Sequence, residues 1–291
     1  MSKEKKEMLL GLVALFTVVA VLGVAAYLMR QLPAQPTLPN DPGLSATDPF
    51  QSGSQSPEIP TEPKPTLVPN PFDAEDFVWC DGFMQLVDGE TITGIDVSYH
   101  QKQIDWQQVK DAGVQFVIVR LGYRGYESGL LVEDNMAMKN LQAARDVGLL
   151  VGAYFYSQAI NAEEAAEEAL FAMEILNGFQ LDLPIAYDWE YVSETARTAN
   201  VDGETMTACT IAFCDTILAG GYETMVYFNP QMAEHKLDMI ALQEKEYPFW
   251  LAHFSEVMTF QHKIWIWQYS YTGKIPGISG TVDLNIMLPH G

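Results

Sequence analysis

Short apolar runs of strand length alternate with helical patterns along the chain from residue 92 to residue 284. The runs that we expect to form strands are 92–97, 116–121, 149–156, 183–189, 224–228, 249–252, 264–269 and 282–284. The segments that we expect to form helices are 106–112, 133–147, 162–177 and 203–219. This alternation is typical of parallel strands joined by helical crossovers. The predicted fold class is therefore α/β, with a sheet that is either open or closed into a barrel.

The loops that follow these strands lack the glycine-rich motifs that bind nucleotides. The first strand runs through Gly94–Ser98 without a dinucleotide fingerprint, and the sequence contains no phosphate-binding P-loop motif. Gly122, Gly125 and Gly129 have the spacing of a loop and not of a phosphate cradle. These observations argue against an open nucleotide-binding sheet and favour a single β/α barrel.

The beginning of the chain has a different character. Residues 8–29 contain no charged side chain and are rich in Leu, Val and Ala. A bilayer core is spanned by about 20 apolar residues, whereas the apolar region of a signal peptide has about 7–15. Because Lys3, Lys5 and Lys6 precede the segment, the positive-inside rule places residues 1–7 in the cytoplasm and the rest of the chain outside. We predict a single transmembrane helix; the alternative is a long cleaved signal peptide and a secreted protein.

A proline-rich stretch, residues 30–72, separates the apolar segment from the predicted barrel. It holds 11 of the 16 prolines, and few apolar side chains are present to offset the entropy of ordering, so we expect an extended, disordered linker. Residues 73–291 are left for the barrel domain. They carry 11 Lys and Arg against 32 Asp and Glu, which argues against nucleic acid as a partner.

Cysteine and histidine usage gives no indication of a metal site. The three cysteines are Cys80, Cys209 and Cys214, and no Cys-x-x-Cys or Cys/His cluster has zinc-binding spacing. Cys209 and Cys214 lie five residues apart in a predicted helix, which is poor geometry for a disulfide. We expect buried free thiols and neither a metal nor a cofactor.

The strand that ends in Asp188-Trp189-Glu190 is the most informative for chemistry. Side chains alternate along a strand, so the two carboxylates share one face, and at the carboxyl end of a barrel strand that face is the active-site mouth. Repulsion and burial should raise one pKa, which leaves a proton donor beside an ionised partner. Cleavage of a glycosidic bond requires this division of roles. The alternative for so short a motif is an exposed pair without function.

Two further acids lie in apolar strands. Asp96 stands near the end of the first strand, and Asp283 lies in the last. A charge among aliphatic neighbours is costly unless it is paired or functional. For either acid alone, a structural carboxylate bonded to backbone amides is the competing interpretation. Four acids at strand ends are harder to explain in that way together.

These residues stand in a series of motifs that together resemble the muramidases of glycoside hydrolase family 25. The matching segments are 94–98, 104–106, 116–120, 122–125, 152–157, 188–190, 250–252, 267–270 and 277–285. They follow in order with compatible spacing from Thr93 to Met287, and the combination is far more specific than any single motif. One departure is Phe155, at a position where the family often has histidine.

The resemblance implies an irregular β/α barrel that hydrolyses the β-1,4 bond between N-acetylmuramic acid and N-acetylglucosamine in peptidoglycan. It implies that Glu190 is the general acid/base and that Asp188 stabilises positive charge at the sugar, directly or through the substrate's acetamido group. Asp96 and Asp283 would hold the sugar and shape the electrostatics. The expected substrate-binding residues are Tyr154, Tyr227, Trp250 and Gln268.

The expected partners are peptidoglycan glycan strands and, through residues 8–29, the bacterial cell membrane, with the catalytic domain outside. Two other interpretations fit the same residues. One is a non-catalytic, peptidoglycan-binding anchor, and the other is a glycosidase that acts on another N-acetylated polysaccharide. A module that had lost its chemistry would be expected to lose Asp188 or Glu190, and both are present. A turnover assay discriminates between these interpretations.

Overall fold

The computed structural model describes residues 65–289. The predicted cytoplasmic N-terminus (1–7), membrane span (8–29) and most of the predicted linker (30–72) lie outside the described residues. Within the described range, no helix has both the length and the apolar character that a membrane crossing needs. The predicted barrel domain, in contrast, is described almost to its end.

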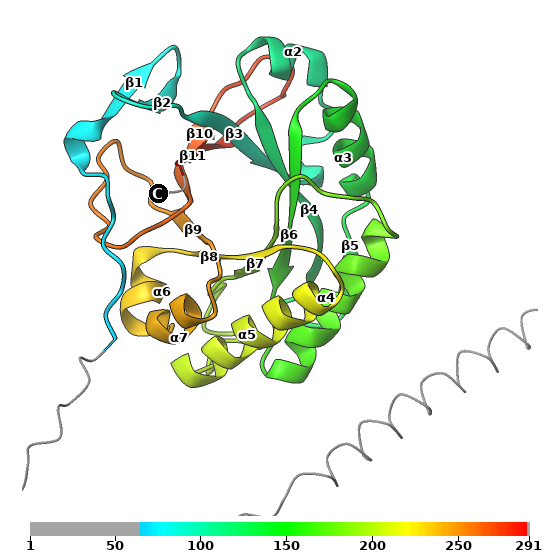
Figure 1. Ribbon diagram of the computed structural model, residues 1–291. Coiled ribbons are helices and arrows are strands. Elements are labelled where there is room, and N and C mark those ends of the chain that lie inside the picture. Colours follow the sequence, from blue (N-terminus) through cyan, green and yellow to red (C-terminus); the bar gives the residue numbers. More distant parts are fainter. Residues whose placement is uncertain (1–64, 290–291) are drawn as a thin grey trace, which may run out of the picture. The chain divides into compact units, whose positions relative to one another are not determined.

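Eight strands form a closed barrel, as predicted (Figure 1). Around the ring they are β3 (Ile92–Val97), β11 (Val282–Met287), β10 (Ile266–Gly273), β9 (Phe249–Ala252), β8 (Thr224–Phe228), β7 (Ile185–Trp189), β6 (Leu150–Ser157) and β4 (Phe116–Arg124), which pairs again with β3. Neighbours are parallel except that β11 runs antiparallel to both β10 and β3. A short loop without a helix links β10 to β11, and a connection of this kind favours an antiparallel pair. A further short strand, β5 (Leu131–Glu133), pairs with β4 outside the ring.

Helices cover most of the outside of the barrel (Figure 1). They are α2 (Trp106–Asp111), α3 (Ala137–Asp146), α4 (Ala162–Leu176), α5 (Gly203–Ala219), α6 (Pro230–His235) and α7 (Met239–Glu244). On the side of β10 and β11 their place is taken by a hairpin of β1 (Phe77–Cys80) and β2 (Phe83–Leu86), whose Met84 N–H donates to the Tyr269 hydroxyl at 3.2 Å. The sequence analysis did not predict this hairpin, α6 or α7.

Asx side chains fix where five α-helices begin. Asp105, Asn161, Asp202, Asn229 and Asp238 precede α2, α4, α5, α6 and α7, and each accepts a hydrogen bond from a backbone N–H of the first turn. Such a cap stabilises a helix by about 1 kcal/mol. The helix predicted at 133–147 begins only at Ala137, because residues 131–133 pair with β4 instead.

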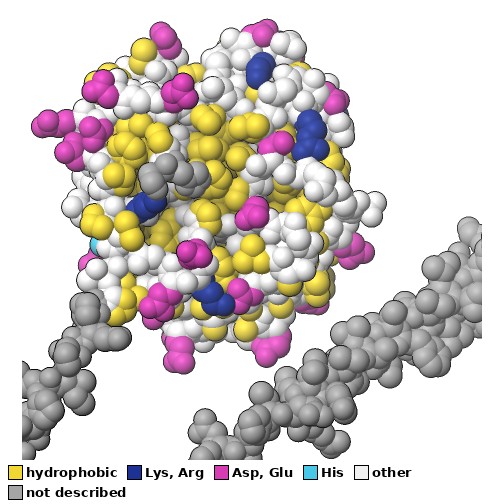
Figure 2. Space-filling model, in the orientation of Figure 1, with side chains coloured by type: hydrophobic (Ala, Val, Ile, Leu, Met, Phe, Trp, Pro, Cys, Tyr) yellow, Lys and Arg dark blue, Asp and Glu magenta, His cyan; other side chains and the backbone are white. Residues whose placement is uncertain are grey.

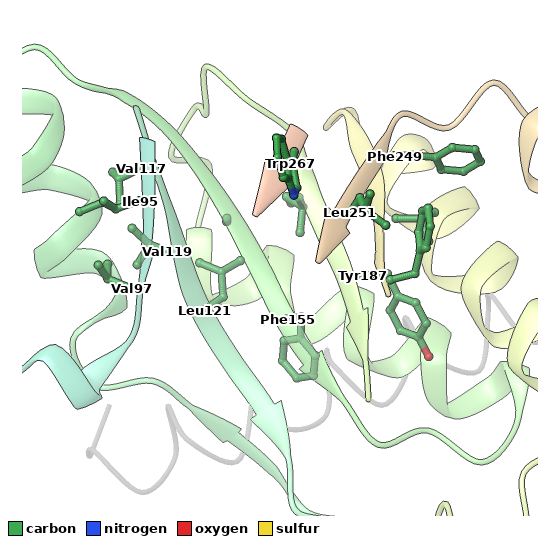
Figure 3. Packing of buried hydrophobic residues seen from close by; sticks show 14 of the residues in the cluster. Ile95, Val97, Val117, Val119, Leu121, Phe155, Tyr187, Phe249, Leu251 and Trp267 are labelled. Carbon is green, nitrogen blue, oxygen red and sulfur yellow. The ribbon is translucent and has the colours of Figure 1, made fainter. Parts of the chain in front are cut away.

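Alternation along the strands divides the apolar side chains between two cores. Val117, Val119 and Leu121 of β4 belong to the core between strands and helices, part of which is shown in Figure 3. Phe116 and Ile118 point the other way and join a smaller cluster inside the barrel. Inward-facing side chains that come after this cluster along each parallel strand therefore lie at the mouth of the barrel, where the carboxyl ends of those strands meet.

One glycine makes this inner packing possible. A Cβ atom at Gly94 would lie 2.3 Å from the ring of Phe116, so only glycine lets that ring fill the barrel beneath Asp96. Phe155, the departure from the family pattern, is fully buried against Phe171 and Phe213 in the outer core. It therefore faces away from the barrel interior.

Two expectations need correction. The domain begins before residue 73: Val68 N–H donates to Gln243 at 2.6 Å, and Asn70 pairs with the backbone at Gln261, so the end of the predicted linker packs along the barrel. Leu67 and Phe72 pack against the core there. The high proline content of the segment gave no indication of these apolar contacts. Of the cysteines, Cys209 and Cys214 are buried free thiols as predicted, but Cys80 is exposed, because it lies in the outer hairpin.

The domain surface is strongly acidic. On the face shown in Figure 2, Asp and Glu side chains are spread over the rim and the middle of the face, with Lys and Arg side chains at a few places between them. This agrees with the excess of acidic residues in the sequence, and such an excess mainly favours solubility.

Candidate active site

One pocket at the carboxyl ends of the parallel strands brings together all eight predicted site residues. Its lining consists of Asp96, Val97, Ser98, His100, Gln101, Arg120, Tyr154, Tyr156, Asp188, Glu190, Tyr227, Trp250, Gln268 and Asp283. Every strand of the ring contributes at least one of them, and β11 does so from its beginning because it runs antiparallel. Register explains the convergence: Asp188 lies opposite Tyr156 on one side and Tyr227 on the other, and Asp283 lies opposite Asp96.

Asp96 is the centre of a hydrogen-bond network. Its Oδ2 accepts from Gln268 Nε2 at 2.7 Å and from Asn285 Nδ2 at 2.8 Å. Gln268 Nε2 also lies 3.4 Å from Oδ2 of Asp283. Burial raises the pKa of Asp96, while these donated hydrogen bonds work in the opposite direction by favouring its charged form.

The amide groups of this network are themselves held by aromatic side chains. The Tyr227 hydroxyl donates to Gln268 Oε1 at 2.8 Å, and Trp250 Nε1 donates to Asn285 Oδ1 at 2.8 Å. These bonds fix which end of each amide faces Asp96, because each oxygen is occupied and each NH₂ group is turned to the acid. Trp250 also packs edge-to-face against Tyr227, with ring centroids 4.7 Å apart.

Asp283 and Asp96 lie side by side and shift each other's pKa. Burial, followed by the charge of Asp96, raises the pKa of Asp283 to about 8. The side-chain hydrogen bond between the two acids raises the pKa of Asp283 and lowers that of Asp96, as expected when protonated Asp283 is the donor. With its pKa raised to about 8, Asp283 is mainly protonated at neutral pH and does not add a second charge beside Asp96.

The second acidic pair, Asp188 and Glu190, is differently placed. Asp188 is the penultimate residue of β7 and is 6% exposed, whereas Glu190 follows the strand and is partly exposed. Asp188 Oδ1 is buried and accepts no hydrogen bond from the part of the chain that the structure describes. Burial, then the charges of Glu190 and Asp96, raise the pKa of Asp188 well above its usual range. The pKa of Glu190 is raised by burial and by the charge of Asp96.

Arg120 is the one permanently cationic side chain in the pocket lining, and sequence reasoning did not single it out. It is bound to buried Asp134 at 3.0 Å, and the rings of Tyr99 and Tyr123 lie 5.0 and 5.4 Å from its guanidinium carbon. Its charge lowers the pKa of Asp188. The alternation of side chains along β4 could have identified Arg120, because it lies two residues beyond inward-facing Ile118 and so points into the barrel as well.

Other residues in and behind the pocket lining also escaped the sequence analysis. Tyr156 lies on the same face of β6 as Tyr154, and Asn285 lies on the same face of β11 as Asp283, so the two-residue period would have identified both. His100 and Gln101 come from the turn after β3, which carries no comparable pattern. Among residues 65–289, no group of three or more His, Cys, Asp and Glu side chains is arranged to hold a metal ion.

Comparison with known proteins identifies the family. The sequence model of the glycosyl hydrolases family 25 matches residues 95–278, which include almost the whole barrel. The chain belongs to this family. It is therefore a glycoside hydrolase, and the site just described occupies the matched region except for Asp283 and Asn285, which follow it.

Individual relatives agree with this assignment. YegX of Escherichia coli (strain K12) is 29% identical over 204 residues, which cover 67% of this chain and 69% of YegX. Lysozyme M1 of Streptomyces globisporus is 27% identical over 214 residues, or 68% of each chain. The structure of the modular autolysin LytC from Streptococcus pneumoniae aligns with a TM-score of 0.62 and 28% identity over 73% of this chain and 52% of LytC. This chain thus spans about half the length of LytC.

Proposed function

We propose that this family 25 enzyme is a muramidase that hydrolyses the β-1,4 bond between N-acetylmuramic acid and N-acetylglucosamine in peptidoglycan. The observation that carries the proposal is the placement of buried Asp188 and partly exposed Glu190 together, at the carboxyl end of β7, in one pocket and with raised pKa values. In this proposal Glu190 is the general acid/base, and Asp188 stabilises the positive charge that develops at the sugar. Two carboxyl groups with different surroundings are the minimum that this chemistry requires.

The substrate decides which member of the pair carries the proton. Glu190 is the more exposed acid, so the oxygen of the departing sugar can reach it and accept its proton. The unpartnered Oδ1 of Asp188 can accept a hydrogen bond from the acetamido N–H of a bound sugar, which favours the charged form of Asp188. Arg120 acts in the same direction on Asp188. The proton then resides on Glu190 and the negative charge on Asp188.

The rest of the pocket provides binding and orientation. Tyr154 and Tyr156 present partly exposed rings, and such rings stack on the faces of sugars. Buried Trp250 packs edge-to-face against Tyr154 and Tyr227 and supports that wall of the pocket. Asp96 and Asp283 offer one charged and one protonated carboxyl group to sugar hydroxyls. Gln268 connects the two halves, because it bonds Tyr227 on one side and Asp96 on the other.

Names of relatives support peptidoglycan as the substrate. Lysozyme M1 is 27% identical to this chain, an autolytic lysozyme of Clostridium acetobutylicum is 25% identical, and LytC was solved in complex with a synthetic peptidoglycan ligand. The test is to digest purified peptidoglycan with the full-length protein and to identify the sugar at the new reducing ends. N-acetylmuramic acid is expected. N-acetylglucosamine at that end would contradict the bond assignment, and binding without any release would favour the anchor interpretation.

We also propose that residues 8–29 hold the enzyme in the bacterial cell membrane, with the barrel outside and residues 30–64 as a spacer. The support is the uncharged apolar segment, the three preceding lysines and the proline-rich sequence that follows. Protease added to intact protoplasts should cut within the spacer and release a soluble domain. A domain that resists external protease until the cells are lysed would contradict this topology.

A further inference from the structure

Glu190 lies just beyond the part of its strand that the barrel holds in place. The pairing of β6 with β7 ends at Ser157 and Trp189, and the connection from Glu190 to Asp202 contains no regular helix or strand. A general acid has to be held within a fraction of an ångström of its productive position. Contacts outside the strand pairing must therefore fix the backbone that carries Glu190.

Gln158, the residue after β6, makes such a contact. It is fully buried, and its Nε2 donates to the backbone carbonyl of Glu190 at 2.8 Å and to that of Ser157 at 2.9 Å. One amide group thus joins the last residue of β6 to the first residue after β7. It extends the strand pairing by one step through a side chain.

Two residues of the loop after β7 keep Gln158 in this orientation. The hydroxyl of Thr198, 1% exposed, donates to Gln158 Oε1 at 2.8 Å, which leaves the NH₂ group directed to the two carbonyls. Arg197 donates to the Gln158 backbone carbonyl at 2.9 Å and forms a two-pronged ion pair with Glu164 at 2.6 and 2.7 Å. The loop after β7 is in this way tied to the beginning of α4.

We propose that Gln158 and Thr198 are positioning residues that set the place of the Glu190 carboxyl group through the Glu190 backbone. Neither residue lines the pocket, so they act on the reaction only through Glu190. The inference rests on the proposed function, since it assumes that Glu190 is the proton donor. It adds a buried amide and a hydroxyl to the catalytic design of this chain.

The proposal makes a specific kinetic demand. Loss of the positioning contact should lower kcat and leave KM nearly unchanged, because the aromatic and amide groups that bind sugar are not touched. It should also let Glu190 approach solvent, so the pKa of Glu190 falls toward its usual value. Because Glu190 has to be protonated to act, the alkaline limb of the kcat profile then moves to lower pH.

The experiment uses the full-length protein and soluble fragments of purified peptidoglycan, with four variants. Thr198→Val removes only the hydroxyl donor at nearly constant shape, and Thr198→Ser retains it. Thr210→Val is the matched control: Thr210 is also 1% exposed, but its hydroxyl bonds only the Met206 carbonyl within α5. Gln158→Met removes the amide itself and is the stronger variant. Folded protein is quantified by a thermal melt before each assay.

The expected result is a fall in kcat of about 10-fold for Thr198→Val, since a displacement of about 1 Å can cost up to about 100-fold. Thr198→Ser and Thr210→Val should retain kcat within about twofold, and the alkaline limb should move only in Thr198→Val and Gln158→Met. Equal kcat and equal pH profiles in Thr198→Val and Thr198→Ser would overturn the inference while leaving the proposed function intact. An inactive wild-type protein would instead overturn the proposed function, and this inference with it.

Discussion

The two acidic pairs of the site face the same pocket but are satisfied in opposite ways. Asp96 receives two amide donors at 2.7 and 2.8 Å, and Asp283 beside it has a pKa raised to about 8. Asp188, which pairs with Glu190, has a buried Oδ1 without a hydrogen-bond donor among the described residues. Buried polar atoms in proteins are almost always paired, so an unpaired one needs an explanation.

The difference separates what the fold completes from what the substrate completes. The Asp96 pair is held by protein groups before any sugar arrives, as a preorganised site requires. Oδ1 of Asp188 lacks a donor among the described residues, and in the proposed function a bound sugar supplies one. Residues of one chemical type, in one pocket, should therefore respond differently to mutation in activity and in stability.

The largest effect is expected for Glu190→Gln. Glutamine has nearly the same shape but cannot deliver a proton, so turnover on peptidoglycan should fall by about 10²–10⁴-fold. The melting temperature should stay the same or rise, because the change removes a partly buried acid from a cluster of acids. A folded Glu190→Gln protein that keeps more than about a tenth of wild-type turnover would rule out the proton-donor role.

Comparison of Asp188→Ala with Asp96→Ala tests the contrast directly. Turnover should fall about 100-fold or more in Asp188→Ala, since the developing charge loses its carboxylate. Its melting temperature should hardly change, because no donor to Oδ1 is lost. Asp96→Ala should lower the melting temperature clearly, since it strands the amide groups of Gln268 and Asn285 at about 1–3 kcal/mol for each buried group. Equal melting temperatures for the two variants would show that the different hydrogen bonding of Asp96 and Asp188 does not affect the stability of the fold.

A smaller effect, on the pH dependence of stability, is expected for Asp283→Asn. The pKa of Asp283 is raised to about 8 in the folded protein, from an ordinary value of 3.8. A raised carboxyl pKa favours the folded state below about pH 4, and this contribution is lost as the pH rises to about 8. The wild-type melting temperature should therefore fall between about pH 5 and pH 8. An asparagine side chain does not titrate, so the variant should show a smaller fall over the same interval, and an unchanged fall would contradict the raised pKa of Asp283.

The sequence predicted the ring of strands, and the position of the four acids follows from local rules. Tyr154, Tyr227, Trp250 and Gln268 were expected only from the family resemblance, and the structure places all eight residues in one pocket. Alternation assigns Asp188 and Glu190 to one face, and strand ends converge in a barrel. What it could not predict depends on partners far apart in the chain. Gln158 bonds a residue 32 positions away, and Asp96 bonds one 189 positions away. The amino-acid composition predicts neither the antiparallel direction of β11 nor the exposure of Cys80.

The smallest effect is expected from chelation, and it tests the other explanation for the unpaired oxygen of Asp188. Four carboxyl groups in one pocket could instead be the ligands of a cation that supplies the missing partner. The geometry argues against this, because Gln268 and Asn285 turn NH₂ groups toward Asp96 and Arg120 lies in the lining, and positively polarised hydrogens there would repel a metal ion. Turnover on purified peptidoglycan should therefore be unchanged after exhaustive treatment with EDTA. If activity were lost and one divalent metal restored it, the acids would be metal ligands and the contrast between the two pairs would need another cause. Repeating the assay with Asp188→Asn would then show whether Asp188 holds that metal.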